Sequence, residues 1–261
     1  MNQQERCVWL IRQLLREQRW EDQIEIPDQF PQCQRLLRGL MNVRPPWPAD
    51  PEWLRIQDDY LQTELNSSVI PDATELPELE PGISLWQGDI TKIKADAIVN
   101  AANNALLGCF IPNHGCIDNA IQSAAGIPLP QACQTLKKKK KMPEPVGQAK
   151  ITPGFNLPAS WVLHTVGPQI QGVLKPRHCE QLASCYTACL QKAADFQLKT
   201  LVFCCISTGE YHFPPQTAAP IAIRTVRTFL ARSGYPFKVI FNVFRDQDAQ
   251  LYRSLLGHSD D

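Results

Sequence analysis

The stretch 96-DAIVNAANNALLGCFIPNHGCIDNAIQSAAG-126 decides the fold. Its first seven residues, 96–102, are mostly apolar and include the β-branched pair Ile98 and Val99, which predicts a buried strand. Its last eleven residues, 116–126, place apolar side chains at helical spacing and predict a helix. A strand followed by a helix is the repeating unit of α/β proteins. The loop between the two carries two cysteines and a histidine.

The same alternation continues along the rest of the sequence after Gly82. Apolar runs predict strands, and segments with helical spacing predict helices between them. The predicted strands are 83–87, 96–102, 161–166, 200–207 and 238–244, and the predicted helices are 116–126, 180–196, 216–233 and 246–256. This order predicts an α/β domain with a largely parallel or mixed sheet between layers of helices. In such sheets ligands bind at the carboxyl ends of the strands.

The first 75 residues have a different texture, which predicts a helical N-terminal extension. Apolar side chains repeat at helical spacing between Val8 and Leu15. The triplet Asp50-Pro51-Glu52 predicts a helix start, because it provides an oxygen cap, a proline in the first turn and an acid near the positive end of the helix dipole. The segment 71-PDATELPELEPG-82 is typical of a linker. We therefore divide the chain into a helical extension, 1–75, and an α/β domain, 76–261.

Composition excludes several classes of protein. The 261 residues are 44% hydrophobic and carry a formal net charge of zero, which argues against a general nucleic-acid binder. The basic run 137-KKKKK-141 is typical of a solvated loop. We expect no membrane association, because no apolar stretch approaches the roughly 20 residues that span a bilayer. The polar start and the ten cysteines favour a reducing, cytoplasmic setting, where close cysteines indicate a metal or catalysis before disulfides.

The spacing C-x4-H-x-C brings Cys109, His114 and Cys116 within eight residues. Thiolates and imidazole suit zinc, and three protein ligands leave one tetrahedral position for water or substrate, as in catalytic sites. Two interpretations remain open from spacing alone: a zinc site, or two buried cysteines beside a hydrogen-bonded histidine. Possible fourth ligands, which would make the site structural, are His164, His212 and Cys133; His164 lies in an apolar run typical of a core histidine, and His178 and His258 are expected at the surface.

Other polar residues flank the two strand ends. Asp118, two residues after Cys116, is placed either to move a proton or to compensate the helix dipole. The side chains of Asn100, Asn103 and Asn104 suit either ribose hydroxyls or turns. The loop 207-STGEYHFPP-215 follows the strongest predicted strand; its backbone N–H groups suit a phosphate, but taken alone the stretch is equally typical of an ordinary strand-to-helix loop.

Taken together, five short motifs resemble the macrodomain family in the same order. They are 87-QGDIT-91, 98-IVNAANN-104, 117-ID-118, 163-LHTVGP-168 and 206-ISTGEYHFP-214. The stretch 108-GCFIPNHGCID-118 resembles the zinc-dependent subgroup of that family, and the helical extension is similar to one found there. The resemblance covers residues 79–256. It implies a three-layer α/β/α macrodomain with a mixed central sheet, preceded by the helical extension.

The resemblance also implies a role for each motif residue. Asp89, with Ile90 beside it, would accept a hydrogen bond from the adenine amino group, and Asn103 would contact the distal ribose. Cys109, His114 and Cys116 would bind one zinc ion next to that ribose. Asp118 would be the catalytic acid or base. The remaining ADP-ribose contacts would come from Cys116, Ile117, Asp118, Ser207, Thr208, Gly209, Glu210 and Tyr211.

The activity implied is zinc-dependent hydrolysis that removes ADP-ribose from mono-ADP-ribosylated proteins. Two alternatives stay open: a non-catalytic ADP-ribose reader with structural zinc, and a deacetylase of O-acetyl-ADP-ribose. Some relatives in the subgroup are linked to a lipoyl carrier protein that a sirtuin-type transferase modifies, which names one candidate partner.

Overall fold

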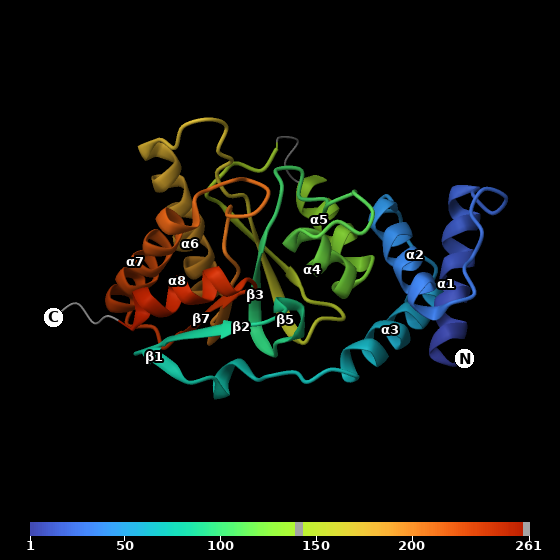
Figure 1. Ribbon diagram of the computed structural model, residues 1–261, viewed down its shortest axis with the longest axis horizontal. Coiled ribbons are helices and arrows are strands. Elements are labelled where there is room, and N and C mark those ends of the chain that lie inside the picture. The colour runs from blue at the N-terminus through green and yellow to red at the C-terminus, as the bar shows by residue number, and fades with distance from the viewer. Residues whose placement is uncertain (139–142, 258–261) are drawn as a thin grey trace.

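The computed structural model describes residues 1–138 and 143–257. Three N-terminal helices share an apolar cluster that also includes Ile127; they are α1 (Gln3–Gln18), α2 (Phe30–Val43) and α3 (Pro51–Asn66). The predicted helix start at Asp50 is confirmed, because its carboxylate accepts a 2.8 Å hydrogen bond from the N–H of Glu52. Figure 1 shows these helices at one end of the molecule, beside α4.

The rest of the described chain forms one mixed sheet of seven strands in the order β1-β2-β7-β6-β3-β5-β4. All five predicted strands are present. The bounds are β1 (Glu78–Glu80), β2 (Ile83–Gln87), β3 (Ala95–Ala101), β4 (Ala149–Pro153), β5 (Ala159–Thr165), β6 (Thr200–Phe203) and β7 (Lys238–Val243). The five inner strands pair in parallel, and β1 and β4 pair antiparallel at the two edges.

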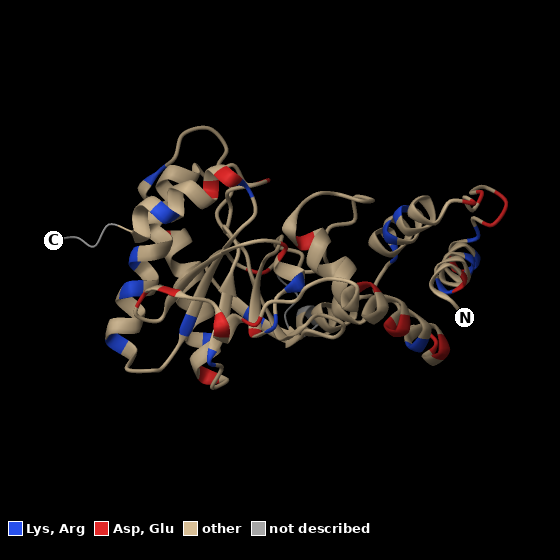
Figure 2. Ribbon diagram, turned by 60° about the horizontal axis from the view of Figure 1, so that its bottom comes forward, with Lys and Arg blue, Asp and Glu red and all other residues tan. Residues whose placement is uncertain are grey.

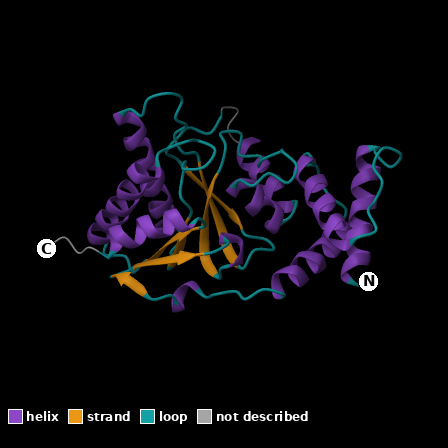
Figure 3. Ribbon diagram, in the orientation of Figure 1, coloured by secondary structure: helices purple, strands orange, loops and turns teal. Residues whose placement is uncertain are grey.

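Helices cover both faces of the sheet, so the predicted three-layer α/β/α arrangement is confirmed. Figures 1 and 3 show α6, α7 and α8 on one side and α4 and α5 on the other. The bounds are α4 (Ile117–Ala125), α5 (Pro128–Lys138), α6 (Pro176–Asp195), α7 (Pro215–Ser233) and α8 (Asp246–Leu256), with single 3₁₀ turns at Ala73–Glu75 and Ile90–Lys92. Helix α5 was not predicted; its two prolines lie in its first turn, where a missing N–H costs nothing.

Three predictions need correction or fall outside the described residues. His178, expected at the surface, is buried in the first turn of α6, where its Nδ1 accepts a hydrogen bond from the N–H of Lys175. The basic run does not begin as a loop, because Lys137 and Lys138 end helix α5. Its residues 139–141, and His258, lie outside the described residues.

Charges are mixed along the ribbon: Figure 2 shows basic and acidic residues interspersed over most elements. Among the described residues, no helix combines the length and the apolar character that crossing a bilayer requires.

Candidate active site and metal centre

The metal loop, residues 108–116, connects the end of β3 to the start of α4. The donor atoms of Cys109, His114 and Cys116 all lie within 4.8 Å of one another. The Sγ of Cys109 is 3.4 Å from the Nδ1 of His114. Two thiols and one imidazole at these separations form a donor set that fits one zinc ion.

Local backbone geometry explains how the metal loop folds back on itself. Gly108 has a φ of +90°, and a Cβ there would lie 3.1 Å from the side chain of Gln122. Asn113 also adopts a left-handed φ, +55°, directly before His114. Cys116 is the N-cap residue of α4, and its Sγ accepts a 3.4 Å hydrogen bond from the N–H of Asn119. The start of α4 therefore fixes the Sγ of Cys116, one of the three donor atoms.

The candidate fourth ligands lie elsewhere. The Sγ of Cys133 and the Nε2 of His164 are 3.7 Å apart in the buried core, and His212 is exposed. Among the described residues, the cluster holds three donors. This count fits a site with an open position for water or substrate.

Burial sets the charge state of one sulfur donor, Cys116. It raises the pKa of the Cys116 thiol to about 12, and the neighbouring Cys109 adds to that rise, while the N–H of Asn119 opposes it. A thiol with this pKa stays protonated at neutral pH unless a cation offsets the thiolate charge. A bound divalent cation would supply that charge, so metal binding and proton release would be coupled.

Asp118 is a buried carboxylate in the first turn of α4, with 5% of its surface exposed. Its Oδ1 accepts a 2.8 Å hydrogen bond from Asn100, and its Oδ2 lies 3.5 Å from the Nδ2 of Asn103. Burial raises the pKa of Asp118 to about 6, although hydrogen bonds from Asn100 and Gln122 oppose the rise. A residue that only compensates a helix dipole has no need of this environment, whereas a pKa near 6 suits a group that accepts a proton.

Asn100 is fully buried, so its side chain contacts other buried residues rather than a ribose. Its Nδ2 group donates to Asp118 and contacts the Nδ1 of His164 at 3.2 Å. Because an amide nitrogen only donates, Nδ1 is the acceptor, and Nε2 carries the hydrogen that binds the Oγ1 of Thr152 at 2.9 Å. The chain Thr152–His164–Asn100 holds the carboxylate of Asp118 in place. Sequence reasoning identified His164 as a core residue but missed this connection.

Asn103 and Asn104 act as turn residues. The Oδ1 of Asn103 accepts from the N–H of Ala105, and its Nδ2 donates to the carbonyl oxygen of Gly108 at 2.9 Å. Asn103 thus ties the end of β3 to the metal loop while its amide stays beside Asp118. The carbonyl oxygen of Asn104 accepts from the N–H of Glu144.

The ligand loop, residues 207–211, approaches the metal loop and Asp118. Strand β6 ends at Phe203, four residues before its predicted end, and the chain then turns through Ser207, whose φ is +66°. Burial, and after it the negative charge of Asp118, raise the pKa of Tyr211. Gly167, at the end of β5, is required here because a Cβ would overlap the Oγ of Ser207.

A contact between Glu210 and His114 joins the two loops. The Oε1 of Glu210 is 3.6 Å from the Nε2 of His114, while the Nδ1 of the same ring faces Cys109. A carboxylate on the far nitrogen of a ligating histidine fixes the orientation of the ring in many metal sites. The predicted residues of the ligand loop and of the metal loop are therefore brought together.

Asp89 follows the carboxyl end of β2, as the metal loop and the ligand loop follow the carboxyl ends of β3 and β6. It caps the 3₁₀ turn Ile90–Lys92, where its Oδ1 accepts from the N–H and the hydroxyl of Thr91. Its side chain is exposed, whereas that of Ile90 is buried, so a ligand would meet the backbone of Ile90. A cavity of about 280 Å³ extends from Asp89 between α2, α3 and α4.

Phe244 is a further candidate that sequence reasoning missed. It follows β7 directly and is 76% exposed. The N–H of Gly88 donates to the carbonyl oxygen of Val243, so Asp89 and Phe244 extend from hydrogen-bonded neighbours. An exposed aromatic face next to a carboxylate suits a planar base. No separate signal marks Phe244 in the sequence, because it is the last residue of the predicted strand 238–244.

Comparison with known proteins identifies the family. The Macro domain family model matches residues 99–222. A protein-ADP-ribose hydrolase from Treponema medium is 47% identical over 264 residues, which cover 98% of this chain and 100% of that protein. A protein-ADP-ribose hydrolase from Staphylococcus aureus (strain MSSA476) is 44% identical over 95% of this chain and 94% of its own length. The chain belongs to the macrodomain family.

Solved structures agree with this assignment. The Oceanobacillus iheyensis macrodomain with ADP has a TM-score of 0.60 and 37% identity, and the match covers 67% of this chain and 89% of that one. The Trypanosoma brucei macrodomain in complex with ADP-ribose has a TM-score of 0.65 and 28% identity, over 84% of this chain and 95% of that one. The fold is that of macrodomains solved with ADP or ADP-ribose.

Proposed function

We propose that this protein is a zinc-dependent hydrolase that removes ADP-ribose from mono-ADP-ribosylated proteins. One observation carries the proposal: Asp118, a buried carboxylate with a pKa near 6, lies two residues from a Cys-His-Cys donor cluster. The full-length similarity to protein-ADP-ribose hydrolases supports the choice of substrate.

Each part of the site has a task in this reaction. Asp89 and Phe244 hold the adenine, the N–H groups of the ligand loop hold the pyrophosphate, and Asn103 contacts the distal ribose beside Asp118. Cys109, His114 and Cys116 hold the zinc ion. When bound, zinc would supply a Lewis acid that positions and polarises an oxygen at the distal ribose.

The chemical step is hydrolysis at the anomeric carbon of that ribose. A water molecule adds to this carbon, and the bond from the carbon to the protein side chain breaks. Asp118 accepts one proton of the attacking water, and the departing side chain takes up a proton from solvent. Positive charge develops on the ribose ring as the bond breaks, as in glycoside hydrolysis, and the Asp118 carboxylate lies where it lowers the energy of that charge.

The modified protein and the cellular location are also proposals. A lipoyl carrier protein modified by a sirtuin-type transferase is the candidate that the family resemblance offers. A cytoplasmic location fits the ten cysteines, all of which are free in the structure.

Release of ADP-ribose from a mono-ADP-ribosylated protein, with and without a chelator, tests the proposal. We expect cleavage by the zinc-loaded protein and loss of cleavage after chelation. The same preparation should be given O-acetyl-ADP-ribose. Cleavage of that ester alone would identify a deacetylase. Tight ADP-ribose binding without cleavage of either substrate would identify a reader with structural zinc.

A further inference from the structure

Helix α2 of the N-terminal extension packs against the metal loop and α4, and the proposed function gives it no task. Figure 1 shows α2 as the extension helix that lies beside α4, and contacts between the two helices agree. Two polar side chains of α2, Arg38 and Asn42, form hydrogen bonds across this contact.

Arg38 of α2 bonds to one proposed metal ligand, His114, and to Asn119, the residue that donates a hydrogen bond to a second, Cys116. One guanidinium nitrogen, Nη2, donates to the carbonyl oxygen of His114 at 3.2 Å and to the Oδ1 of Asn119 at 2.8 Å. Asn119 in turn donates its N–H to the Sγ of Cys116. A single cation of α2 therefore bridges the backbone of His114 and the residue that holds Cys116.

Asn42, one turn farther along α2, fixes the turn before His114. Its Oδ1 accepts the N–H of Asn113 at 3.0 Å, and its Nδ2 donates to the Oγ of Ser123 on α4 at 2.9 Å. Asn113 has the left-handed φ that the turn requires. The bond from Asn42 satisfies the Asn113 amide in that turn conformation.

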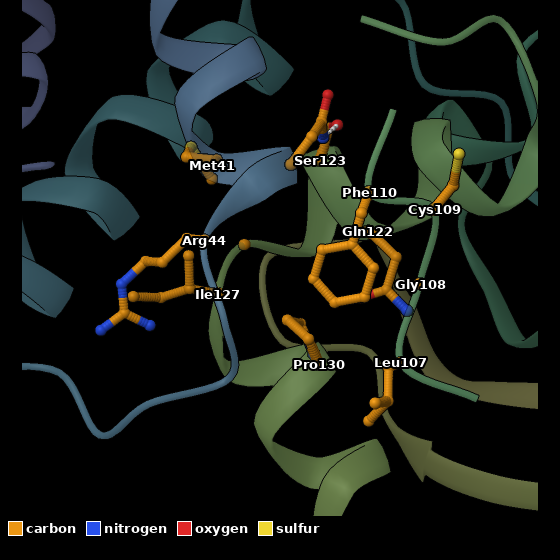
Figure 4. Close-up of a pocket in the computed structure, with 12 residues that line it drawn as sticks. Met41, Arg44, Leu107, Gly108, Cys109, Phe110, Gln122, Ser123, Ile127 and Pro130 are labelled. Carbon is orange, nitrogen blue, oxygen red and sulfur yellow. Dashed lines mark hydrogen bonds between the residues drawn. The ribbon is translucent and has the colours of Figure 1, made fainter. Parts of the chain in front are cut away.

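Gly39 of α2 leaves room for the side chain of Asn113. A Cβ on Gly39 would lie 2.9 Å from the Nδ2 of Asn113, so a larger side chain there would force this amide group to shift. Figure 4 shows the space between α2 and the loop, with Met41 on one side and Cys109 and Phe110 on the other. The cavity measures about 20 Å³, room for about one water molecule.

We propose that α2 positions the metal loop, so that the N-terminal extension is part of the metal centre. Arg38 and Asn42 are positioning residues: they set the backbone at Asn113 and His114 and the start of α4 at Cys116. The inference rests on the proposed zinc site. Mutation of residues that hydrogen-bond to metal ligands, without binding the metal themselves, typically lowers metal affinity about 10- to 100-fold.

Zinc affinity of folded variants tests this role, measured by competition with a chromophoric chelator well below the melting temperature. Arg38→Ala should lower zinc affinity about tenfold or more. Arg35→Ala is the matched control, because Arg35 is an exposed arginine of the same helix; it should bind zinc as the wild type does. Equal zinc affinity of Arg38→Ala and Arg35→Ala would overturn the proposal.

A second pair of variants separates positioning of the loop from packing between helices. Asn42→Ala removes the acceptor for Asn113. Ser123→Ala removes the contact of Asn42 with α4, together with the bond of the Ser123 hydroxyl to the carbonyl oxygen of Asn119, and leaves the bond from Asn113 to Asn42 in place. We expect zinc affinity to fall in the first variant and to stay near the wild-type value in the second. The opposite order would overturn the role of Asn42.

The wild type supplies a test that needs no variant. Hydrogen exchange at the Asn113 amide should be slowed even in zinc-free protein, because its acceptor is on α2; exchange at the rate of an unstructured peptide would overturn the proposal. If the wild type bound no zinc, the proposed metal centre would fail together with this inference. If it bound zinc and Arg38→Ala matched it, only the role of α2 would fail.

Discussion

His164 should make the protein less stable in mild acid, and the size of the effect follows from its burial. The ring is 1% exposed, and burial lowers its pKa from the ordinary value near 6.5 to about 4. Between these two values the unfolded chain binds a proton that the folded protein excludes. The free energy of unfolding should therefore fall as the pH drops from 6.5 to 4, by about 3 kcal/mol at 1.36 kcal/mol per pKa unit. Above pH 7 this contribution is constant.

Urea denaturation followed by tryptophan fluorescence measures this loss, with chelator present so that metal release does not contribute. Two titratable groups lie near the His164 ring: Cys133, which contacts it, and Asp118, which is linked to it through Asn100. Burial raises the pKa of Cys133 to about 12, which places it outside the window. Asp118, the partner of Asn100, should be changed to Asn in both proteins compared. Relative to Asp118→Asn with His164→Gln, Asp118→Asn alone should lose about 2–3 kcal/mol more between pH 7.5 and 4.5. Equal losses would show that His164 does not titrate as a buried neutral ring.

Three further predictions concern the metal and the ligand. One zinc ion per chain should copurify, and the double change Cys109→Ala and Cys116→Ala should abolish it; metal analysis that finds full zinc in this variant would refute the ligand assignment. Asp89→Ala should weaken ADP-ribose binding about tenfold or more, since a hydrogen bond to a charged group contributes about 1.5–3 kcal/mol, and calorimetry that finds unchanged affinity would exclude this adenine site. Gly167→Ala should lower ADP-ribose affinity at least about tenfold because its Cβ displaces Ser207 of the ligand loop; a variant that binds as tightly as the wild type would show that the loop adapts.

The sequence predicts the inner sheet well because its strands are continuous apolar runs. Strand β2 matches its prediction at both ends, and β3 does so within one residue. Both edge strands were missed. Strand β1 lies inside the segment 71–82, which the sequence predicts to be a linker, and β4 is short and ends at Pro153, which is tolerated only at an edge. Strand β6 was predicted too long because the buried residues after Phe203 continue the apolar pattern without continuing the hydrogen-bonded ladder.

The candidate site also has a part that the sequence predicts and a part that it does not. The cluster of Cys109, His114 and Cys116 is local in sequence, so spacing alone could propose it. Its supports are not local: Arg38 lies 76 residues from His114, and Asn100 lies 64 residues from His164. Such contacts depend on how the helices and strands pack together, and no local pattern encodes them. The family resemblance could name Asp118, but the burial that raises its pKa appears only in the folded chain.

Single-turnover cleavage of a mono-ADP-ribosylated protein by Asp118→Ala tests the central claim most directly. The control is Asp246→Ala, which removes an exposed acid from the first turn of α8 and so reproduces the loss of a dipole contact. Both variants should be folded and zinc-loaded, and both should bind ADP-ribose. The account predicts that Asp118→Ala cleaves about 10²- to 10⁴-fold more slowly than the wild type while Asp246→Ala is unchanged. Cleavage by folded, zinc-loaded Asp118→Ala at the wild-type rate would contradict it.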